Sequence, residues 1–144
     1  MVDRDASVET IRREMTTFAR RARAVAARIH PELSLVSFTL LAHLEDSDGC
    51  RATDLAAHYL LDKSTVSRQI SALERLGYVE RRTDPADHRV QVLHLTASGT
   101  EVLRGVTASR RALMQRRLAD WDVADLEQFA TYLRRYNATN DPLD

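Results

Sequence analysis

Residues 63–75 combine short hydroxyl side chains with long cations on one face of an expected helix. Val66, Ile70 and Leu73 recur at positions i, i+4 and i+7, which places them on the buried face. The opposite face carries Lys63, Ser64, Thr65, Ser67, Arg68, Ser71 and Arg75. Hydroxyls bond phosphates or base edges, arginine bonds guanine bidentately, and short side chains let a helix approach a groove. The face can therefore read double-stranded DNA, and a plain solvated helix is the alternative.

A second polar group lies at the tip of an expected β-hairpin. The runs 78–82 and 90–95 contain the β-branched and aromatic residues of strands, and Asp and Pro residues separate them. Asp87, His88 and Arg89 follow at this tip. An extended arginine can enter a minor groove, and Asp87 can hold the Arg89 guanidinium by a charge-assisted hydrogen bond. The hairpin favours a DNA-binding function for both groups.

Apolar periodicity and capping residues predict the helices that position these two groups. A first amphipathic helix carries an apolar stripe and ends near His30 and Pro31; the stripe is Ile11, Met15, Phe18, Ala22, Val25 and Ile29. A second helix begins with Ser34 as its N-cap and stops within residues 45–49. The stripe of the first helix needs a partner helix to cover it.

Two short helices joined by two or three residues are expected next, and they would form a helix-turn-helix. Thr53 is the expected cap of the first, and the second runs from Asp62 as its cap to Gly77. Leu60 and Leu61 occupy the turn, where glycine is common, so we expect the turn to pack tightly into the core.

The chain continues with two more expected helices after the hairpin. Thr96 is the expected cap of a long helix, and Asp122 with Asp125 resembles the capping box of a last one. The predicted order is therefore helix, helix, helix-turn-helix, hairpin, helix, helix.

Composition indicates a single globular domain that is mainly α-helical. The 144 residues are 44% hydrophobic and 29% charged, with four glycines and three prolines. The formal net charge is zero, so the case for DNA depends on where the cations lie and not on their surplus. The single cysteine, Cys50, and an acidic N-terminus without a signal-peptide pattern predict a cytoplasmic protein. No apolar run approaches the roughly 20 residues that span a bilayer, so no membrane partner is expected.

Three stretches together resemble the MarR family of winged helix-turn-helix transcription regulators. They are DLAAHYLLDKSTVSRQISALERLGYVERR, DPADHR and HLTASG. The wing of that family reads Asp-Pro-x-Asp-Arg-Arg, then a strand and Leu-Thr-x-x-Gly; Asp84, Pro85, Asp87, Arg89, Leu95, Thr96 and Gly99 match it. His88 stands where arginine is common, so a permanent positive charge is absent there.

The resemblance implies a mainly α winged helix-turn-helix with a two- or three-stranded β wing. It places a dimerisation helix at residues 1–32, the DNA-binding region at 33–95 and dimerisation helices at 96–144, all in one intertwined domain. A homodimer would bind a near-palindromic DNA site, because two-fold symmetry places two recognition helices about one helical turn apart. Repression released by a small-molecule effector is the expected mode, and the sequence carries no signature for the effector.

The sequence supports three other classes of function less well than DNA binding. No catalytic motif or cofactor-binding loop is present, so we expect neither an enzyme nor a cofactor. A metal site built from His43, Cys50 and His58, or oxidation of Cys50, would make the chain a metal- or redox-responsive regulator. Winged helices also bind proteins, so an interaction module is the remaining alternative.

Overall fold

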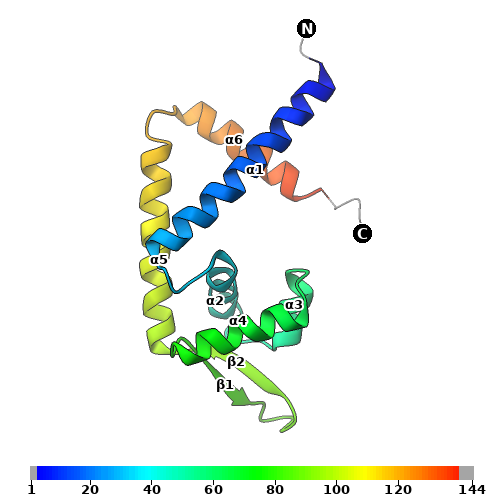
Figure 1. Ribbon diagram of the computed structural model, residues 1–144, viewed down its shortest axis with the longest axis vertical. Helices are drawn as coiled ribbons and strands as arrows, with labels where there is room; N and C mark the ends of the chain where they lie inside the picture. Colours follow the sequence, from blue (N-terminus) through cyan, green and yellow to red (C-terminus); the bar gives the residue numbers. More distant parts are fainter. Residues whose placement is uncertain (1–2, 140–144) are drawn as a thin grey trace. The chain divides into compact units, whose positions relative to one another are not determined.

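A computed structural model describes residues 3–139 of the protein. Its elements are α1 (Arg4–Ile29), α2 (Leu35–Ser47), α3 (Ala52–His58), α4 (Lys63–Arg75), β1 (Val79–Thr83), β2 (Gln91–Leu95), α5 (Ala97–Arg117) and α6 (Val123–Asn137), as Figure 1 shows. The chain divides into two compact units, Met1–Thr107 and Ala108–Asp144, and α5 crosses the boundary. The mainly helical class and the small β wing are confirmed. No helix among these residues is long and apolar enough to cross a membrane.

Side-chain hydrogen bonds confirm the caps predicted at Ser34, Thr96 and Asp122, whereas Asp62 lies at the N-cap of α4 but makes no side-chain bond to it. The Ser34 hydroxyl accepts a hydrogen bond from the Ser37 backbone N–H at 3.0 Å, and Asp122 accepts one from Asp125 at 2.8 Å. The cap expected at Thr53 is wrong, because α3 begins at Ala52 and Thr53 lies inside its first turn. Its N-cap is Arg51, which makes no side-chain bond to the helix.

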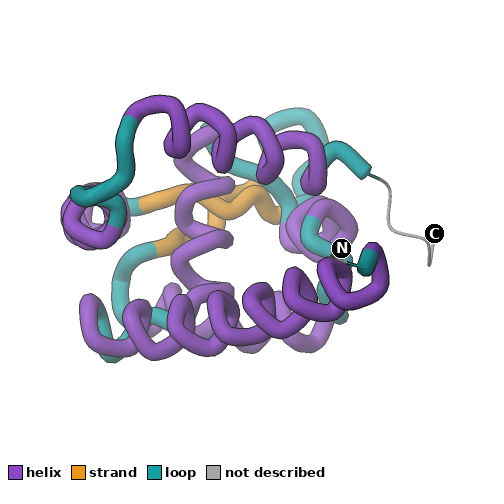
Figure 2. The backbone as a smooth tube through the Cα atoms, turned by 90° about the horizontal axis from the view of Figure 1, so that it is seen from above, coloured by secondary structure: helices purple, strands orange, loops and turns teal. Residues whose placement is uncertain are grey.

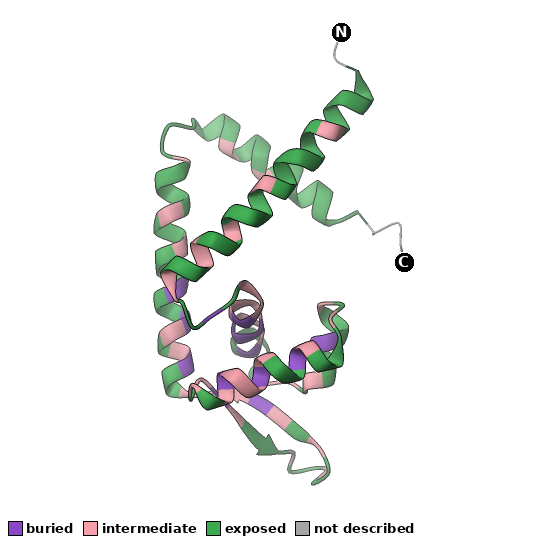
Figure 3. Cartoon of the chain, in the orientation of Figure 1, coloured by how far each residue is buried: buried purple, intermediate pink, exposed green. Residues whose placement is uncertain are grey.

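The core of the first unit surrounds α2, which contacts α1, α4 and β2. Figure 3 shows the buried residues gathered on α2, α4, β2 and the first turns of α5. The buried apolar residues are Leu33, Leu40, Leu41, Leu44, Leu55, Ala56, Val66, Ile70, Leu73, Val79, Leu93, Leu103 and Val106. The buried face predicted for residues 63–75 is therefore confirmed, and the recognition face opposite is held on a packed support.

The turn of the helix-turn-helix comprises residues 59–62, longer than the two or three expected. Leu61 packs against the core, but Leu60 is 82% exposed, so the expectation that both leucines are packed inside is wrong for Leu60. Leu60 has a φ of 52°, a left-handed conformation that carries its side chain away from the core.

The wing is an antiparallel pair of strands, drawn in orange in Figure 2. Its register pairs Val79 with Leu95 and Thr83 with Gln91. A single bridge between Cys50 and Leu93 joins the start of α3 to β2, so the third strand is reduced to one residue. This bridge holds the middle of β2 beside the residues that precede α3.

Apolar side chains on α1 and α6 remain uncovered in the single chain. On α1, Val8, Ile11, Met15 and Phe18 are exposed, and Phe18 retains 63% of its accessible surface. In the second unit, none of residues 108–139 is buried. Its exposed large apolar residues are Met114, Trp121, Val123, Phe129, Tyr132, Leu133 and Tyr136. In each unit taken by itself, exposed large apolar side chains of this kind favour an interface.

Candidate nucleic-acid interface

The face of α4 opposite the core presents the hydroxyl and cationic side chains that the sequence indicates. The exposed members are Lys63, Ser64, Ser67, Arg68 and Arg75, and the half-buried ones are Thr65 and Ser71. Their spacing places most of them on one side of the helix, away from Val66, Ile70 and Leu73. The helix N-terminus, with its partial positive charge, lies at the Lys63 end.

Arg68 occupies the middle of this face. Its Nη2 donates a long hydrogen bond of 3.5 Å to the Thr65 hydroxyl, one turn earlier on the same helix. So long a bond constrains the guanidinium weakly. Arg68 can therefore turn its donors toward a base edge without breaking a strong contact.

The flank of α4 is fixed by a polar contact with α2. The buried hydroxyl of Ser37 donates a 2.7 Å hydrogen bond to the Gln69 side-chain oxygen, and Ser34 lies 3.0 Å from Ser37. Hydrogen bonds are directional, unlike apolar packing, so this contact restrains rotation of α4 about its axis. Gln69 was not predicted as part of the site, and no sequence spacing links residues 32 positions apart.

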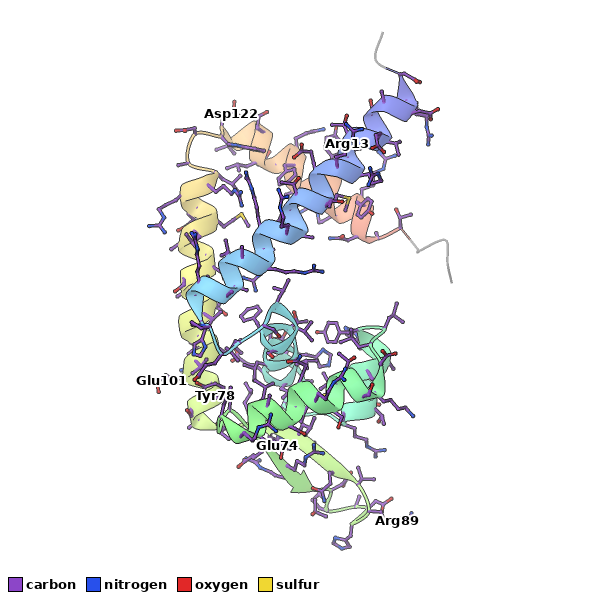
Figure 4. All side chains as sticks on the ribbon, viewed as in Figure 1. Arg13, Glu74, Tyr78, Arg89, Glu101 and Asp122 are labelled. Carbon is purple, nitrogen blue, oxygen red and sulfur yellow. The ribbon has the colours of Figure 1, made fainter. Side chains whose placement is uncertain are left out.

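The wing tip holds Arg89 in an extended position, as Figure 4 shows at the end of the hairpin. Its Nε donates to one Asp87 carboxylate oxygen at 3.1 Å and its Nη2 to the other at 3.3 Å. The predicted contact between these residues is confirmed. The hydrogen bonds from Arg89 hold the pKa of Asp87 below its usual value, so this carboxylate stays ionised. The Arg89 side chain is 90% exposed, and His88 beside it is exposed too.

Three other arginines support the wing. Arg81 on β1 donates to Glu74 on α4 at 2.8 Å, and Arg82 donates through Nε to Glu80 at 2.9 Å. Arg51, at the start of α3, lies 4.0 Å from the Asp84 carboxylate at the wing turn. These pairs cross between the helix-turn-helix and the hairpin, or run along the hairpin, and none of them was predicted. Among them, the pair of Arg81 and Glu74 joins the wing directly to the recognition helix.

The histidines and the cysteine do not form the metal site that the sequence left open. The His43 and His58 rings are 4.8 Å apart, and His43 Nδ1 lies 3.0 Å from the Tyr59 hydroxyl. Within residues 3–139, no group of three or more His, Cys, Asp or Glu side chains is placed to hold a metal ion. Among these described residues, His43, Cys50 and His58 are therefore not gathered as a set of metal ligands. Burial raises the pKa of the Cys50 thiol, which lowers its reactive thiolate fraction.

A recognition helix beside a wing, both carrying exposed cations and held by a common core, defines a winged helix-turn-helix DNA-binding protein. The sequence model of the MarR family matches residues 33–90. An uncharacterised HTH-type transcriptional regulator of Bacillus subtilis, YxaD, is 34% identical over 132 residues, which are 90% of this chain and 92% of that protein. The chain belongs to the MarR family and is a DNA-binding transcription regulator.

Solved structures show the same fold. The crystal structure of MarR has a TM-score of 0.78 at 23% identity, covering 95% of this chain and 92% of that one. BpsR of Bordetella bronchiseptica, whose DNA binding is regulated by 6-hydroxynicotinic acid, has a TM-score of 0.73 at 21% identity. The alignment covers 89% of this chain and 93% of BpsR.

Proposed function

We propose that this chain binds a near-palindromic double-stranded DNA site as a homodimer and represses transcription by occupying it. The DNA contacts are Lys63, Ser64, Thr65, Ser67, Arg68, Ser71 and Arg75 on α4, with Asp87, His88 and Arg89 on the wing. The observation that carries this proposal is the exposed hydroxyl and cationic face of α4, opposite the buried Val66, Ile70 and Leu73. Phosphate contacts would orient the protein, and Arg68 would read a base edge.

This proposal assigns a separate role to each part of the chain. Residues 33–95 bind DNA, whereas residues 1–32 and 96–144 supply the dimer interface of one intertwined cytoplasmic domain. The exposed apolar side chains of α1 and α6 support the assignment, because a partner subunit would cover them. No catalytic step is part of the proposed function, since occupancy of the site suffices for repression.

A cavity in the first unit supports the proposal that a small effector binds the protein and releases it from DNA. A hollow of about 470 Å³ lies in the first unit between the end of α1, the following loop, α2 and α4. Arg23, Glu32, Ser34, Ser37 and Gln69 contribute polar groups to its lining. A molecule bound there would touch the contact between Ser37 and Gln69 that restrains α4. BpsR is an example of this fold with ligand-regulated DNA binding.

Salt dependence separates this function from that of a protein-interaction module. Arginine and lysine contacts to phosphates release counterions, so DNA affinity falls steeply with salt concentration. From about 50 to about 200 mM salt we expect the affinity for a bound duplex to fall by a factor on the order of 10³. Fluorescence anisotropy of labelled duplexes, selected from random DNA, measures the affinity at each salt concentration. Failure to retain any duplex at low salt would contradict the proposal.

A further inference from the structure

The end of the recognition helix and the start of α5 meet at one threonine. The Thr96 hydroxyl donates a 2.6 Å hydrogen bond to the backbone oxygen of Gly77, just after α4. The same hydroxyl accepts a 3.0 Å bond from the backbone N–H of Gly99 in the first turn of α5. One side chain is thus the N-cap of α5 and a tie to the C-terminal end of α4.

Backbone contacts reinforce this tie from both sides. The Thr96 N–H donates to the Tyr78 oxygen at 3.1 Å, directly beside the paired residues Val79 and Leu95 at the base of the wing. Tyr78 in turn donates through its N–H to the Leu73 oxygen of α4 at 3.0 Å. Gly77 makes the sharp exit from α4 with a φ of 80°. Helix α4, the wing and α5 therefore converge on residues 77, 78 and 96.

Gly99 allows the close approach that these bonds need. A Cβ atom at this position would lie 2.1 Å from the Tyr78 backbone oxygen, too near for any side chain. Figure 4 shows Tyr78 beside the start of α5. We call the set Gly77, Tyr78, Thr96 and Gly99 the clasp.

The hydrogen bonds of the clasp restrict rotation of α4 relative to α5 more than apolar packing alone does. Buried leucines and valines accept small rotations at modest cost, whereas a 2.6 Å hydrogen bond fixes both distance and direction. Helix α5 continues from the clasp into the unit Ala108–Asp144. In the proposed dimer, the orientation of α4 relative to α5 therefore determines where each recognition helix meets DNA.

We propose that Thr96 is a positioning residue for DNA recognition: its hydroxyl fixes α4 on α5 and so sets the half-site spacing that the dimer accepts. This inference rests on the proposed function. Without the bond to Gly77, α4 gains freedom at its C-terminal end. The dimer would then bind half-sites at several separations with similar affinity.

The test measures affinity against operator spacing. Duplexes carry two inverted half-sites with the selected spacer or with one base pair more or fewer, which shifts a half-site by about 3.4 Å and turns it by roughly 35°. Thr96→Val removes the hydroxyl, and we expect its preference for the selected spacer to fall about ten-fold relative to the original chain, the scale of one hydrogen bond. Thr96→Ser retains the hydroxyl and should retain the preference.

Two further variants separate positioning from stability. Thr96→Asp keeps an N-cap acceptor for Gly99 but has no donor for Gly77, so α5 remains capped and the spacing preference should still relax. Thr39→Val is the matched control, because among residues 3–139 the Thr39 hydroxyl bonds only the Leu35 oxygen of its own helix, at 2.9 Å. The control should keep the preference. Circular dichroism confirms that each variant folds.

The outcomes are distinguishable from failure of the proposed function. An unchanged spacing preference in Thr96→Val and Thr96→Asp, with the original chain bound to paired half-sites, would overturn the role of Thr96 alone. Unfolding of both variants would overturn it too, since Thr96 would then serve folding and not positioning. If the original chain shows no preference for paired half-sites, the proposed dimeric function fails and this inference falls with it.

Discussion

Arg68 and Arg89 are both exposed arginines, yet their surroundings suit them to different tasks. Arg68 lies mid-way along α4 with a long bond to Thr65, so its donors are available to a base edge. Arg89 is held at the wing tip by two bonds to the Asp87 carboxylate. A guanidinium fixed in an extended position suits the minor groove or the phosphates beside it.

Replacing each arginine tests this difference. Arg68→Ala should weaken binding by roughly 1 to 3 kcal/mol and relax the sequence preference at one position per half-site. Arg89→Ala should weaken binding with less change in base preference. Arg13→Ala is the control, because Arg13 pairs with Glu9 on α1, away from both groups. Titration against the selected site and single-base variants measures this; unchanged affinity in both test variants would refute the assignment.

The sequence predicts contacts between residues that are neighbours along the chain and not contacts across the fold. The pair Asp87 and Arg89 is foreseeable because two residues in a turn lie close together. Arg51 beside Asp84 joins residues far apart in the chain, as does Ser37 with Gln69. Such pairs depend on how α2, α3 and the wing pack, which no local pattern specifies.

At the scale of elements, Gly77 and Gly105 give a matched test of how the recognition helix ends. Gly77 has a φ of 80°, whereas Gly105 lies within α5. A Cβ atom added at either glycine would meet no described atom within 4 Å, apart from the adjacent residues and, for Gly105, the backbone of its own helix. Both sites therefore have room for a methyl group, and they differ in backbone conformation. Gly77→Ala should lower the free energy of unfolding by about 1 to 2 kcal/mol, because alanine is strained in a left-handed conformation.

The partner variant, Gly105→Ala, should raise the free energy of unfolding by roughly 0.5 to 1 kcal/mol, because alanine is the better helix former. Urea denaturation followed by circular dichroism measures both changes. Equal effects of the same sign would mean that backbone conformation at Gly77 does not govern the end of α4.

Most elements could be predicted because periodicity and capping act locally. The apolar positions of α2 and α4 and the caps at Ser34, Thr96 and Asp122 follow from such patterns. Thr53 is not the cap because α3 begins one residue earlier, at Ala52, and Leu60 leaves the core through its left-handed backbone conformation. The exact start of α3 and the conformation of the turn are therefore details that local patterns did not specify.

At the scale of the molecule, the apolar stripe of α1 has more exposed surface than a lone subunit would normally keep. Phe18 is 63% exposed and is the most exposed of its large apolar residues. A partner subunit that covers this stripe would remove it from water and supply part of the free energy of association. Charge placed on the stripe should therefore dissociate the dimer.

Phe18→Asp tests the interface directly. We expect sedimentation velocity to show monomers at concentrations where the original chain is dimeric, because the substitution would bury a charge in an apolar contact. Thr16→Asp adds the same charge away from the stripe, where the Thr16 hydroxyl bonds the Arg12 oxygen of its own helix. The control should stay dimeric, and equal dissociation of both variants would argue against the stripe as the interface.

The most direct test of the account is a footprint of the purified protein on its selected DNA. Hydroxyl-radical cleavage should show two protected half-sites in inverted orientation, about 10 base pairs apart between centres, because two α4 helices related by two-fold symmetry enter successive major grooves. Added protection flanking each half-site would mark the wings. A single unsymmetrical protected half-site would contradict the dimeric winged helix-turn-helix account.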